Sequence, residues 1–184
     1  PKPLQGKPFT YNEACNQGLT QYAIQKLLDA GTIERLERGL YRSVDEDLSD
    51  EELYRRAIKR VGKPVVVCLL SALSFYELTD TIPRQVWLMV PKEKRVKSSS
   101  VKLYRARDPK WKIGIVQKDG YSITSLERTI IDALTLKALI SPRLGVDALK
   151  TAISSKKTSP NKVLQVATEL GVKHRVLAYI EALT

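Results

Sequence analysis

The chain has little of the chemistry that classical hydrolases and metalloproteins need. It has one histidine, His174, and two cysteines, Cys15 and Cys68, among 184 residues. A single histidine excludes a histidine-rich metal site and argues against a serine or cysteine triad, because each triad uses a histidine as its base. The two cysteines are far apart and have apolar neighbours, so we expect reduced, partly buried thiols. We predict no metal and no cofactor.

The chain also lacks glycine-rich loops of the kind that bind nucleotide phosphates, and it lacks membrane-spanning segments. Neither GxxxxGK nor GxGxxG occurs. The longest apolar runs, residues 65–70 and 87–90, are far too short to span a bilayer, and no signal peptide is visible. These absences predict a cytoplasmic protein without a membrane partner. Because the chain begins at Pro1 rather than methionine, we expect an N-terminal segment to have been processed or omitted.

Positive charge is abundant and unevenly distributed. The 31 basic and 20 acidic residues give a net charge of +11, which favours an anionic partner such as nucleic acid. Residues 1–91 hold 12 side chains of each sign, residues 92–118 hold 10 basic and 2 acidic, and residues 119–184 hold 9 and 6. The segment 92–118 is either a phosphate-binding patch or a solvated loop between strands. Its candidate phosphate contacts are Lys92, Lys94, Arg95, Lys97, Lys102, Arg105 and Arg107.

Residues near the N-terminus carry the boundaries of two short helices. Thr10 and Glu13 have the spacing of a capping box, which predicts a helix over residues 11–17. Gly18 permits the positive φ of a sharp turn. Thr20 then caps a second helix, and Gly31 ends it. The result is a helix, a tight turn and a helix.

A glycine-tipped β-hairpin follows these helices. The strands are predicted over residues 32–36 and 40–42, with Gly39 in the turn. Ile33 and Leu36 are three residues apart, so we expect a bulge or bend in the first strand. The order of elements predicts a winged helix-turn-helix over residues 1–45. We expect a first helix of this domain to have been lost together with the omitted N-terminal segment.

Such a unit offers two kinds of contact to DNA. The second helix enters the major groove, where glutamine suits adenine and lysine or arginine suits guanine. Arginines of the hairpin meet phosphates or the minor groove. The alternative is a solvated helix face without a DNA partner. The glycine-tipped, arginine-bearing hairpin favours DNA binding. The candidate DNA-binding residues are Thr20, Gln21, Tyr22, Gln25, Lys26, Arg35, Arg38, Tyr41 and Arg42.

The rest of the chain is predicted to form an acidic linker with a helix over residues 46–62 and an α+β domain over residues 63–184. Ser49 and Glu52 are spaced as a second capping box. Ser71 is expected to cap a short helix. Short β-favouring runs predict a small antiparallel sheet, and helices complete the C-terminus. The predicted strands are 65–69, 86–90, 101–105, 113–117 and 121–124, and the last three predicted helices are 144–154, 160–171 and 172–183.

Charged residues on one predicted helix raise an alternative function. Glu127, Arg128 and Asp132 follow the last strand, so a nucleic-acid-acting enzyme, either a nuclease or an RNA-modifying enzyme, is conceivable. The simpler interpretation is that Thr124 and Glu127 form a third capping box and that Arg128 and Asp132 form an exposed ion pair. We therefore expect no catalytic residues and no enzymatic activity.

Three stretches of the chain resemble the AbiEi-type antitoxins of bacterial type IV toxin–antitoxin systems. GTIERLERGLYR at residues 31–42 resembles the family's wing, and LLSALSFYELTDTIPRQVWLMVP at residues 69–91 resembles its serine-capped helix and strand. The most distinctive stretch is YSITSLERTIIDAL at residues 121–134. Many relatives have a histidine in the second stretch, where this chain has Phe75, Tyr76 and Glu77.

The resemblance implies a cytoplasmic bacterial antitoxin of two domains that acts in abortive infection, a form of phage defence. The winged domain is expected to bind inverted repeats in the operon's own promoter and to repress transcription. The C-terminal domain is expected to neutralise a nucleotidyltransferase toxin. In a type IV system the antitoxin acts without a stable complex with the toxin, so operator DNA is the physical partner implied.

Overall fold

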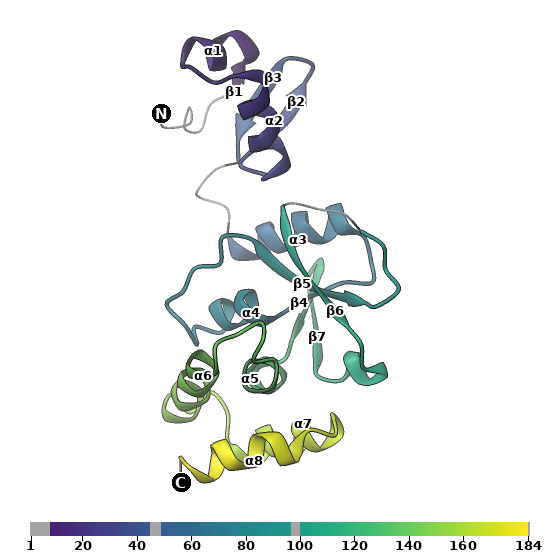
Figure 1. The fold of residues 1–184 in the computed structure, drawn as a ribbon, viewed down its shortest axis with the longest axis vertical. Helices are drawn as coiled ribbons and strands as arrows, with labels where there is room; N and C mark the ends of the chain where they lie inside the picture. Colours follow the sequence, from purple (N-terminus) through teal and green to yellow (C-terminus); the bar gives the residue numbers. More distant parts are fainter. Residues whose placement is uncertain (1–7, 45–48, 97–99, 184) are drawn as a thin grey trace. The chain divides into compact units, whose positions relative to one another are not determined.

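The computed structural model describes residues 8–44, 49–96 and 100–183 (Figure 1). The chain divides into two compact units. Unit 1 comprises residues 1–53 with 97–100, and unit 2 comprises residues 54–96 with 101–184. Residues 45–48, which hold much of the predicted acidic linker, lie outside the described residues.

Unit 1 combines two short helices with a three-stranded antiparallel sheet. The sheet order is β1-β3-β2. Strand β1 was not predicted from the sequence, and it pairs with β3 so that Phe9 lies opposite Tyr41. The elements are β1 (Pro8–Thr10), α1 (Tyr11–Asn16), α2 (Gln21–Asp29), β2 (Ile33–Glu37) and β3 (Leu40–Ser43).

Local hydrogen bonds explain the boundaries of the unit 1 elements. The backbone N–H of Thr10 donates to Glu13 Oε2 at 2.6 Å, and the N–H of Glu13 donates to Thr10 Oγ1 at 3.3 Å, which confirms the capping box. Thr20 Oγ1 accepts from the N–H of Ala23 at 3.2 Å, so the cap of α2 is also confirmed. Gly18 has φ +85°, as the turn requires. The register of the hairpin shifts between Arg35 and Glu37, which confirms the predicted bulge.

Unit 2 is built around a five-stranded sheet in the order β6-β5-β4-β8-β7. Most of α3 belongs to this unit, since the division of the chain falls after Leu53. The elements are α3 (Asp50–Val61), β4 (Val66–Val67), α4 (Leu69–Phe75), β5 (Val86–Pro91), β6 (Val101–Ala106), the 3₁₀-helix η1 (Pro109–Lys112), β7 (Ile115–Lys118), β8 (Tyr121–Thr124), α5 (Leu126–Thr135), α6 (Pro142–Ser154), α7 (Pro160–Glu169) and α8 (Lys173–Glu181).

The sheet is mixed, whereas the sequence predicted an antiparallel one. Pairs β4–β5 and β7–β8 are antiparallel, but β5–β6 and β4–β8 are parallel. Residues 92–100 connect β5 to β6, and nine extended residues reach roughly 30 Å, enough to return along a strand of about 20 Å. This length, rather than a hairpin turn, makes the parallel pairing possible.

Helices cover both faces of the sheet. One face carries a core cluster in which Tyr54, Ala57, Ile58 and Val61 of α3 pack with sheet residues such as Leu88. On the other face α5 lies against the sheet, and α6, α7 and α8 pack around α5 (Figure 1). Residues 128–135 of α5 are all buried as a result.

Close contact between α5 and α6 depends on a glycine. A Cβ added at Gly145 would lie 2.8 Å from the carbonyl oxygen of Ala133, which is too close for a carbon atom. The absence of a side chain therefore lets the backbones of the two helices approach each other. This contact helps to enclose the side chains of α5.

Two predicted caps in unit 2 are wrong. Ser125 caps α5, because its Oγ accepts from the N–H of Arg128 at 3.2 Å, while Thr124 Oγ1 lies 2.7 Å from Thr129 Oγ1. The cap position of α4 is Cys68, and Ser71 lies inside the helix, where its Oγ accepts from the N–H of Trp87 at 2.9 Å. Thr124 cannot serve as a cap because it is the last residue of β8 and is fully buried.

The remaining predicted caps agree more closely with the structure. Ser49 Oγ accepts from the N–H of Glu52 at 3.3 Å. Ser159 caps α7, with Pro160 as its first residue, as the sequence predicted. The predicted strand 65–69 is shorter than expected, because Leu69 already begins α4.

Candidate nucleic-acid interface

Helix α2 presents a polar and aromatic face that nothing else in unit 1 covers. Ile24 is only 3% exposed and belongs to the core of unit 1, whereas Tyr22 is 79% exposed. Gln25 is held within the helix, because its Nε2 donates to Asp29 Oδ1 at 3.0 Å. The exposed residues on this side are Thr20, Gln21, Tyr22, Gln25 and Lys26. The structure therefore places Gln21, Tyr22, Gln25 and Lys26 on one side of α2 and leaves Thr20 exposed at its N-cap.

The three hairpin arginines differ in how freely they can reach a ligand. Arg38 is exposed in the turn between β2 and β3, beside Gly39, whose φ is +82°. Arg35 donates from Nε to the carbonyl oxygen of Glu37 at 3.1 Å. The guanidinium of Arg42 forms an ion pair with Glu34. A phosphate would have to compete with a carboxylate for Arg42, but not for Arg38.

Tyr41 corrects the predicted set of DNA contacts. Its side chain is only 9% exposed and packs in the core of unit 1. The ring stacks on Phe9 with 6.0 Å between the ring centres. Alternation along β3 turns Tyr41 inward and Arg42 outward, so Tyr41 supports the unit instead of facing a ligand.

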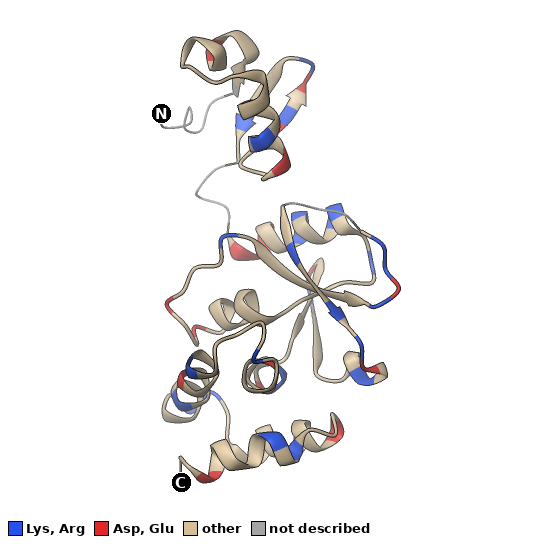
Figure 2. Ribbon diagram, in the orientation of Figure 1, with Lys and Arg blue, Asp and Glu red and all other residues tan. Residues whose placement is uncertain are grey.

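Unit 1 has no surplus of positive charge. Residues 8–44 contain four basic and four acidic side chains. Figure 2 shows these charges spread over α1, α2 and the β2–β3 hairpin. Any affinity of this unit for DNA must therefore come from the placement of individual side chains, because its net charge supplies none.

The basic segment of unit 2 includes an edge strand as well as a loop. Lys94 donates to the carbonyl oxygen of Lys63 at 2.9 Å, and Arg105 donates to that of Val96 at 3.4 Å. The ammonium of Lys102 lies 5.7 Å from the centre of the Trp87 ring. Lys97 lies outside the described residues. The exposed members of the predicted patch are Lys92, Arg95, Lys102, Arg105 and Arg107.

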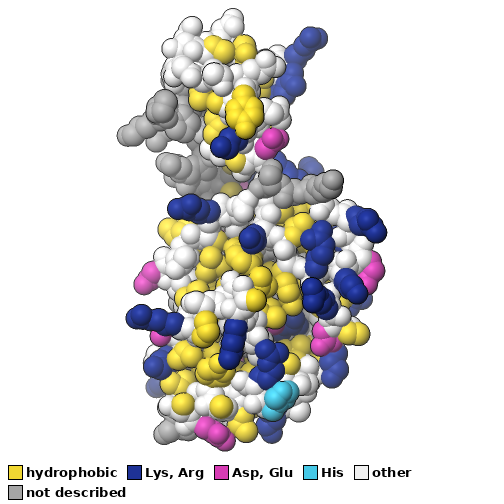
Figure 3. Space-filling model, in the orientation of Figure 1, with side chains coloured by type: hydrophobic (Ala, Val, Ile, Leu, Met, Phe, Trp, Pro, Cys, Tyr) yellow, Lys and Arg dark blue, Asp and Glu magenta, His cyan; other side chains and the backbone are white. Residues whose placement is uncertain are grey.

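These cations have a structural explanation in addition to a functional one. Strand β6 is at the edge of the sheet, and charged side chains on an edge strand discourage pairing with another chain. Basic side chains colour the β5–β6 connection and η1 in Figure 2, and they are scattered among apolar ones on the visible face of unit 2 in Figure 3. The segment is thus both a protected edge and a basic surface.

The charged trio of α5 is not an accessible site. Arg128 and Asp132 were expected to form an exposed ion pair, but their side chains are only 6% and 8% exposed. Arg128 Nε donates to Asp132 Oδ1 at 2.9 Å, and its NH1 donates to the carbonyl oxygen of Ile113 at 2.6 Å. Glu127 accepts from Thr158 Oγ1 at 2.7 Å, so it joins α5 to the segment before α7 instead of completing a capping box.

Burial changes the acidity of groups near this ion pair. It raises the pKa of Asp132, against the opposing effect of the Arg128 charge. Asp132 Oδ2 is buried without a hydrogen-bond partner in the structure. Burial also raises the pKa of the Cys68 thiol well above its ordinary value. Cys15, by contrast, is exposed, so the expectation of partial burial is wrong for this residue.

The residues at the end of α4, Phe75, Tyr76 and Glu77, are tied to neighbouring elements. Tyr76 donates from its hydroxyl to the carbonyl oxygen of Thr124 at 2.9 Å, and burial raises its pKa to about 12. Glu77 pairs with Lys157 at 2.7 Å, which lowers the pKa of the Glu77 carboxyl. The ring of Phe75 packs edge-on against Tyr76.

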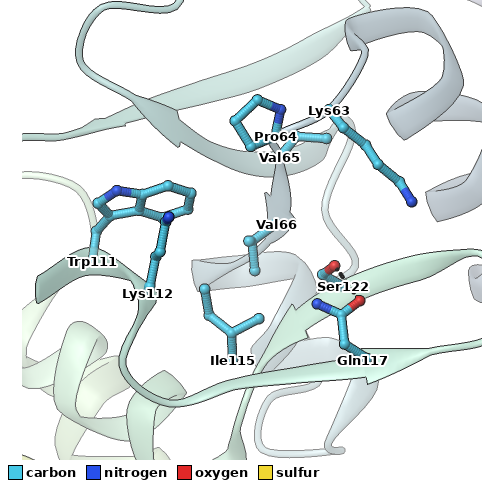
Figure 4. A pocket seen from close by; sticks show the side chains of 9 residues that line it. All are labelled: Lys63, Pro64, Val65, Val66, Trp111, Lys112, Ile115, Gln117 and Ser122. Atoms are coloured by element: carbon cyan, nitrogen blue, oxygen red, sulfur yellow. Dashed lines mark hydrogen bonds between the residues drawn. The ribbon is translucent and has the colours of Figure 1, made fainter.

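A pocket in unit 2 was not foreseen from the sequence. It has a volume of about 400 Å³ and opens between η1, β7 and the residues before β4 (Figure 4). Its residues come from segments that are far apart in the chain, so no sequence motif marks it. The lining residues are Lys63, Pro64, Val65, Val66, Trp111, Lys112, Ile115, Gln117 and Ser122.

The described residues offer neither a cluster of metal ligands nor a membrane-spanning helix. Within residues 8–44, 49–96 and 100–183, histidine, cysteine and acidic side chains do not gather in groups of three that could hold a metal ion. The helices that the structure describes are all too short or too polar to cross a bilayer.

Comparison with known proteins bears on unit 1. Residues 4–44 match the AbiEi antitoxin family of transcriptional regulators. The resemblance of the chain to AbiEi antitoxins is thereby confirmed over this segment, and the family that matches there is one of transcriptional regulators. The match ends one residue after β3, so the two resembling stretches of unit 2 lie outside it. No curated protein matches the chain.

Proposed function

We propose that unit 1 is a winged helix-turn-helix that binds operator DNA in the promoter of its own operon. The exposed face of α2 is the observation that carries this proposal. The element order β1-α1-α2-β2-β3 and the match to AbiEi transcriptional regulators support it. In this proposal α2 is the recognition helix and the β2–β3 hairpin is the wing.

The spacing of side chains on α2 suits entry into a major groove. Gln21 and Gln25 are four residues apart, as are Tyr22 and Lys26, so the four side chains form two adjacent rows on one side of the helix. Gln25 can pair with adenine once its amide leaves Asp29, and Lys26 can donate to guanine. Gln25 must therefore break its hydrogen bond to Asp29 before it can contact a base.

Arg38 is the side chain best placed to contact phosphate. It is exposed at the tip of the wing, and among the described residues no carboxylate is shown to pair with it. A phosphate contact of this kind supplies affinity for any sequence and makes binding depend on salt.

Binding to the promoter fragment upstream of the chain's own gene tests this assignment. Gln25→Ala or Lys26→Ala should relax preference at particular base pairs, at a cost of about 1–3 kcal/mol there. Arg38→Ala should weaken binding to all sequences and reduce the salt slope by about 1. Arg143→Ala, which removes an exposed arginine from α6 in unit 2, is the matched control. Unchanged binding by all three unit 1 variants would contradict the assignment.

We further propose that the exposed cations of residues 92–107 add phosphate contacts to nucleic-acid binding. Lys92 and Arg95 are exposed, whereas Lys94 is held by the backbone of Lys63. Reversing both charges with Lys92→Glu and Arg95→Glu should therefore weaken binding in a salt-dependent manner. An affinity that does not change would contradict this second proposal.

Unit 2 is proposed to neutralise a nucleotidyltransferase toxin without forming a stable complex with it. Toxicity of the neighbouring gene product, relieved by co-expression of this chain, would support the proposal. Arg38→Ala should impair promoter binding and leave relief of toxicity intact. Incubation with labelled operator DNA and tRNA tests the enzymatic alternative directly, since a cleaved or modified product would establish catalysis.

A further inference from the structure

The pocket of unit 2 has an apolar floor between two basic ends. Val66 of β4 and Ile115 of β7 point toward its middle, and Pro64 lies above them in Figure 4. Trp111 and Lys112 stand together on one side, and Lys63 extends on the opposite side, near Gln117 and Ser122. This arrangement fits a ligand that has an apolar or planar body and carries negative charge.

The polar groups of the pocket are mostly hydrogen-bond donors. Ser122 Oγ donates to Gln117 Oε1 at 2.9 Å, which fixes the amide so that its nitrogen faces Ile115 and the pocket (Figure 4). Lys63, Lys112 and the indole N–H of Trp111 also offer only donors. None of the nine lining residues is acidic. The donor set is therefore complementary to an anion such as phosphate.

Trp111 supplies a surface on which a planar ring can stack. The ammonium of Lys112 lies 5.9 Å from the centre of the Trp111 ring. A bound phosphate would attract the Lys112 ammonium away from the Trp111 ring, and the ring face would then be free to stack on an aromatic ligand. One cation–π contact is thus replaced by an ion pair and a stacking contact. The volume of about 400 Å³ lies within the range of small-molecule sites.

We propose that this pocket binds one nucleotide, with the base on the apolar floor beside Trp111 and the phosphate held by Lys112. The same chemistry is offered by a free nucleotide and by a terminal nucleotide of RNA. This site is separate from the proposed DNA-binding face, because all of its residues belong to unit 2 and that face belongs to unit 1.

Trp111 itself can report binding. The chain has two tryptophans, so a Trp87→Phe background leaves Trp111 as the only indole. In this background the full chain is titrated with each of the four ribonucleoside triphosphates, with a short single-stranded RNA and with inorganic phosphate. Saturable quenching by a nucleotide or by the RNA is expected, and the tighter of the two identifies the source. Quenching by neither, or phosphate binding as tightly as every nucleotide, would overturn the proposal.

Charge variants separate a specific site from general attraction to a basic protein. Lys112→Glu should weaken nucleotide binding at least 10-fold. Lys150→Glu makes the same change of charge at an exposed position of α6 outside the pocket and should leave binding within 2-fold. Equal weakening by both variants would contradict the site. Lys112 is itself exposed, so the variant should fold, and circular dichroism verifies this.

Two further variants complete the test. Calorimetry of Trp111→Leu should show at least 10-fold weaker binding if the indole stacks on the base, and unchanged affinity would contradict the stacking. Gln25→Ala should bind nucleotide as the unaltered chain does, while its operator preference changes. Failure of the nucleotide site is thus distinguishable from failure of the DNA-binding proposal.

Discussion

The two units differ in how much core supports their surfaces. Unit 1 has five buried apolar side chains in one cluster, whereas unit 2 has clusters of 20 and 12 on the two faces of its sheet. The stability of unit 1 therefore depends on a few buried side chains and on its helix caps. The comparison teaches that the face proposed to read DNA rests on the smaller scaffold.

The units also differ in charge. Residues 8–44 are balanced, with four side chains of each sign, whereas residues 92–118 carry 10 basic and 2 acidic side chains. In the proposed function, α2 of unit 1 therefore reads the bases and Arg38 contacts phosphate, while the surplus of positive charge lies in unit 2. Unit 2 further differs by enclosing an ion pair, which unit 1 does not do within its described residues.

Removal of Arg128 should give the largest loss of stability. Arg128→Met leaves the Asp132 carboxylate buried without its partner, so the free energy of unfolding of unit 2 should fall by about 3–5 kcal/mol. Urea denaturation followed by tryptophan fluorescence measures it, because both tryptophans belong to unit 2. Arg143→Met, which breaks an exposed pair with Asp147, should cost less than about 0.5 kcal/mol. Equal losses in the two variants would contradict the role of burial.

The small core of unit 1 should be damaged by one truncation. Ile24 is 3% exposed among only five core residues, so Ile24→Ala should cost roughly 2–5 kcal/mol. Thermal unfolding by far-UV circular dichroism, together with operator binding, measures this loss. The fluorescence midpoint of unit 2 should stay unchanged. An equal shift of that midpoint would show that the two units unfold together, and it would contradict the expectation that unit 1 is destabilised alone.

A glycine in unit 2 tests how closely its helices pack. Alanine in the middle of a helix ordinarily stabilises it relative to glycine by about 1 kcal/mol. At Gly145 the added Cβ would meet the backbone of Ala133 at 2.8 Å, so Gly145→Ala should instead destabilise unit 2 by about 1–3 kcal/mol. Urea denaturation gives the sign. A gain in stability would mean that α5 and α6 separate easily.

The smallest effect concerns acid and the first cap of unit 1. Hydrogen bonds from Thr10 lower the pKa of Glu13 below its value in the unfolded chain. The ionised carboxylate therefore stabilises unit 1 above the ordinary glutamate pKa of about 4.3, and this contribution is lost as pH falls through the lower folded-state pKa. Glu13→Gln should flatten the decline of the circular dichroism melting temperature between about pH 6 and pH 3. Glu37→Gln, which removes an equal charge from the hairpin, should preserve the decline.

Features of unit 1 were predictable because their causes are local. Thr10 and Glu13, which form the capping box, are three residues apart, and Gly18 lies in the turn that it permits. The residues that determine these features are therefore close together in the sequence. In unit 2 the sequence Thr124-Ser125 offers two neighbouring caps, and only the burial of Thr124 in β8 decides in favour of Ser125. A single sequence contains no sign of that burial.

The candidate site was predictable only in part, for the same reason. Periodicity placed Gln25 and Lys26 on the outer face of α2, but it did not show that Tyr41 turns inward against Phe9. The spacing of Arg128 and Asp132 predicted their ion pair, whereas its burial depends on α6, α7 and α8 packing around α5. The pocket could not be predicted from the sequence, because its lining residues come from segments that are far apart in the chain.

Arg128 also has a consequence outside the interior. Its NH1 group donates to the carbonyl oxygens of both Trp111 and Ile113, at 3.2 Å and 2.6 Å. The segment that bears the indole is thereby held in place by the buried guanidinium of Arg128. Substitutions in α5 that displace this guanidinium should therefore change the shape of the pocket, although they replace none of its lining residues.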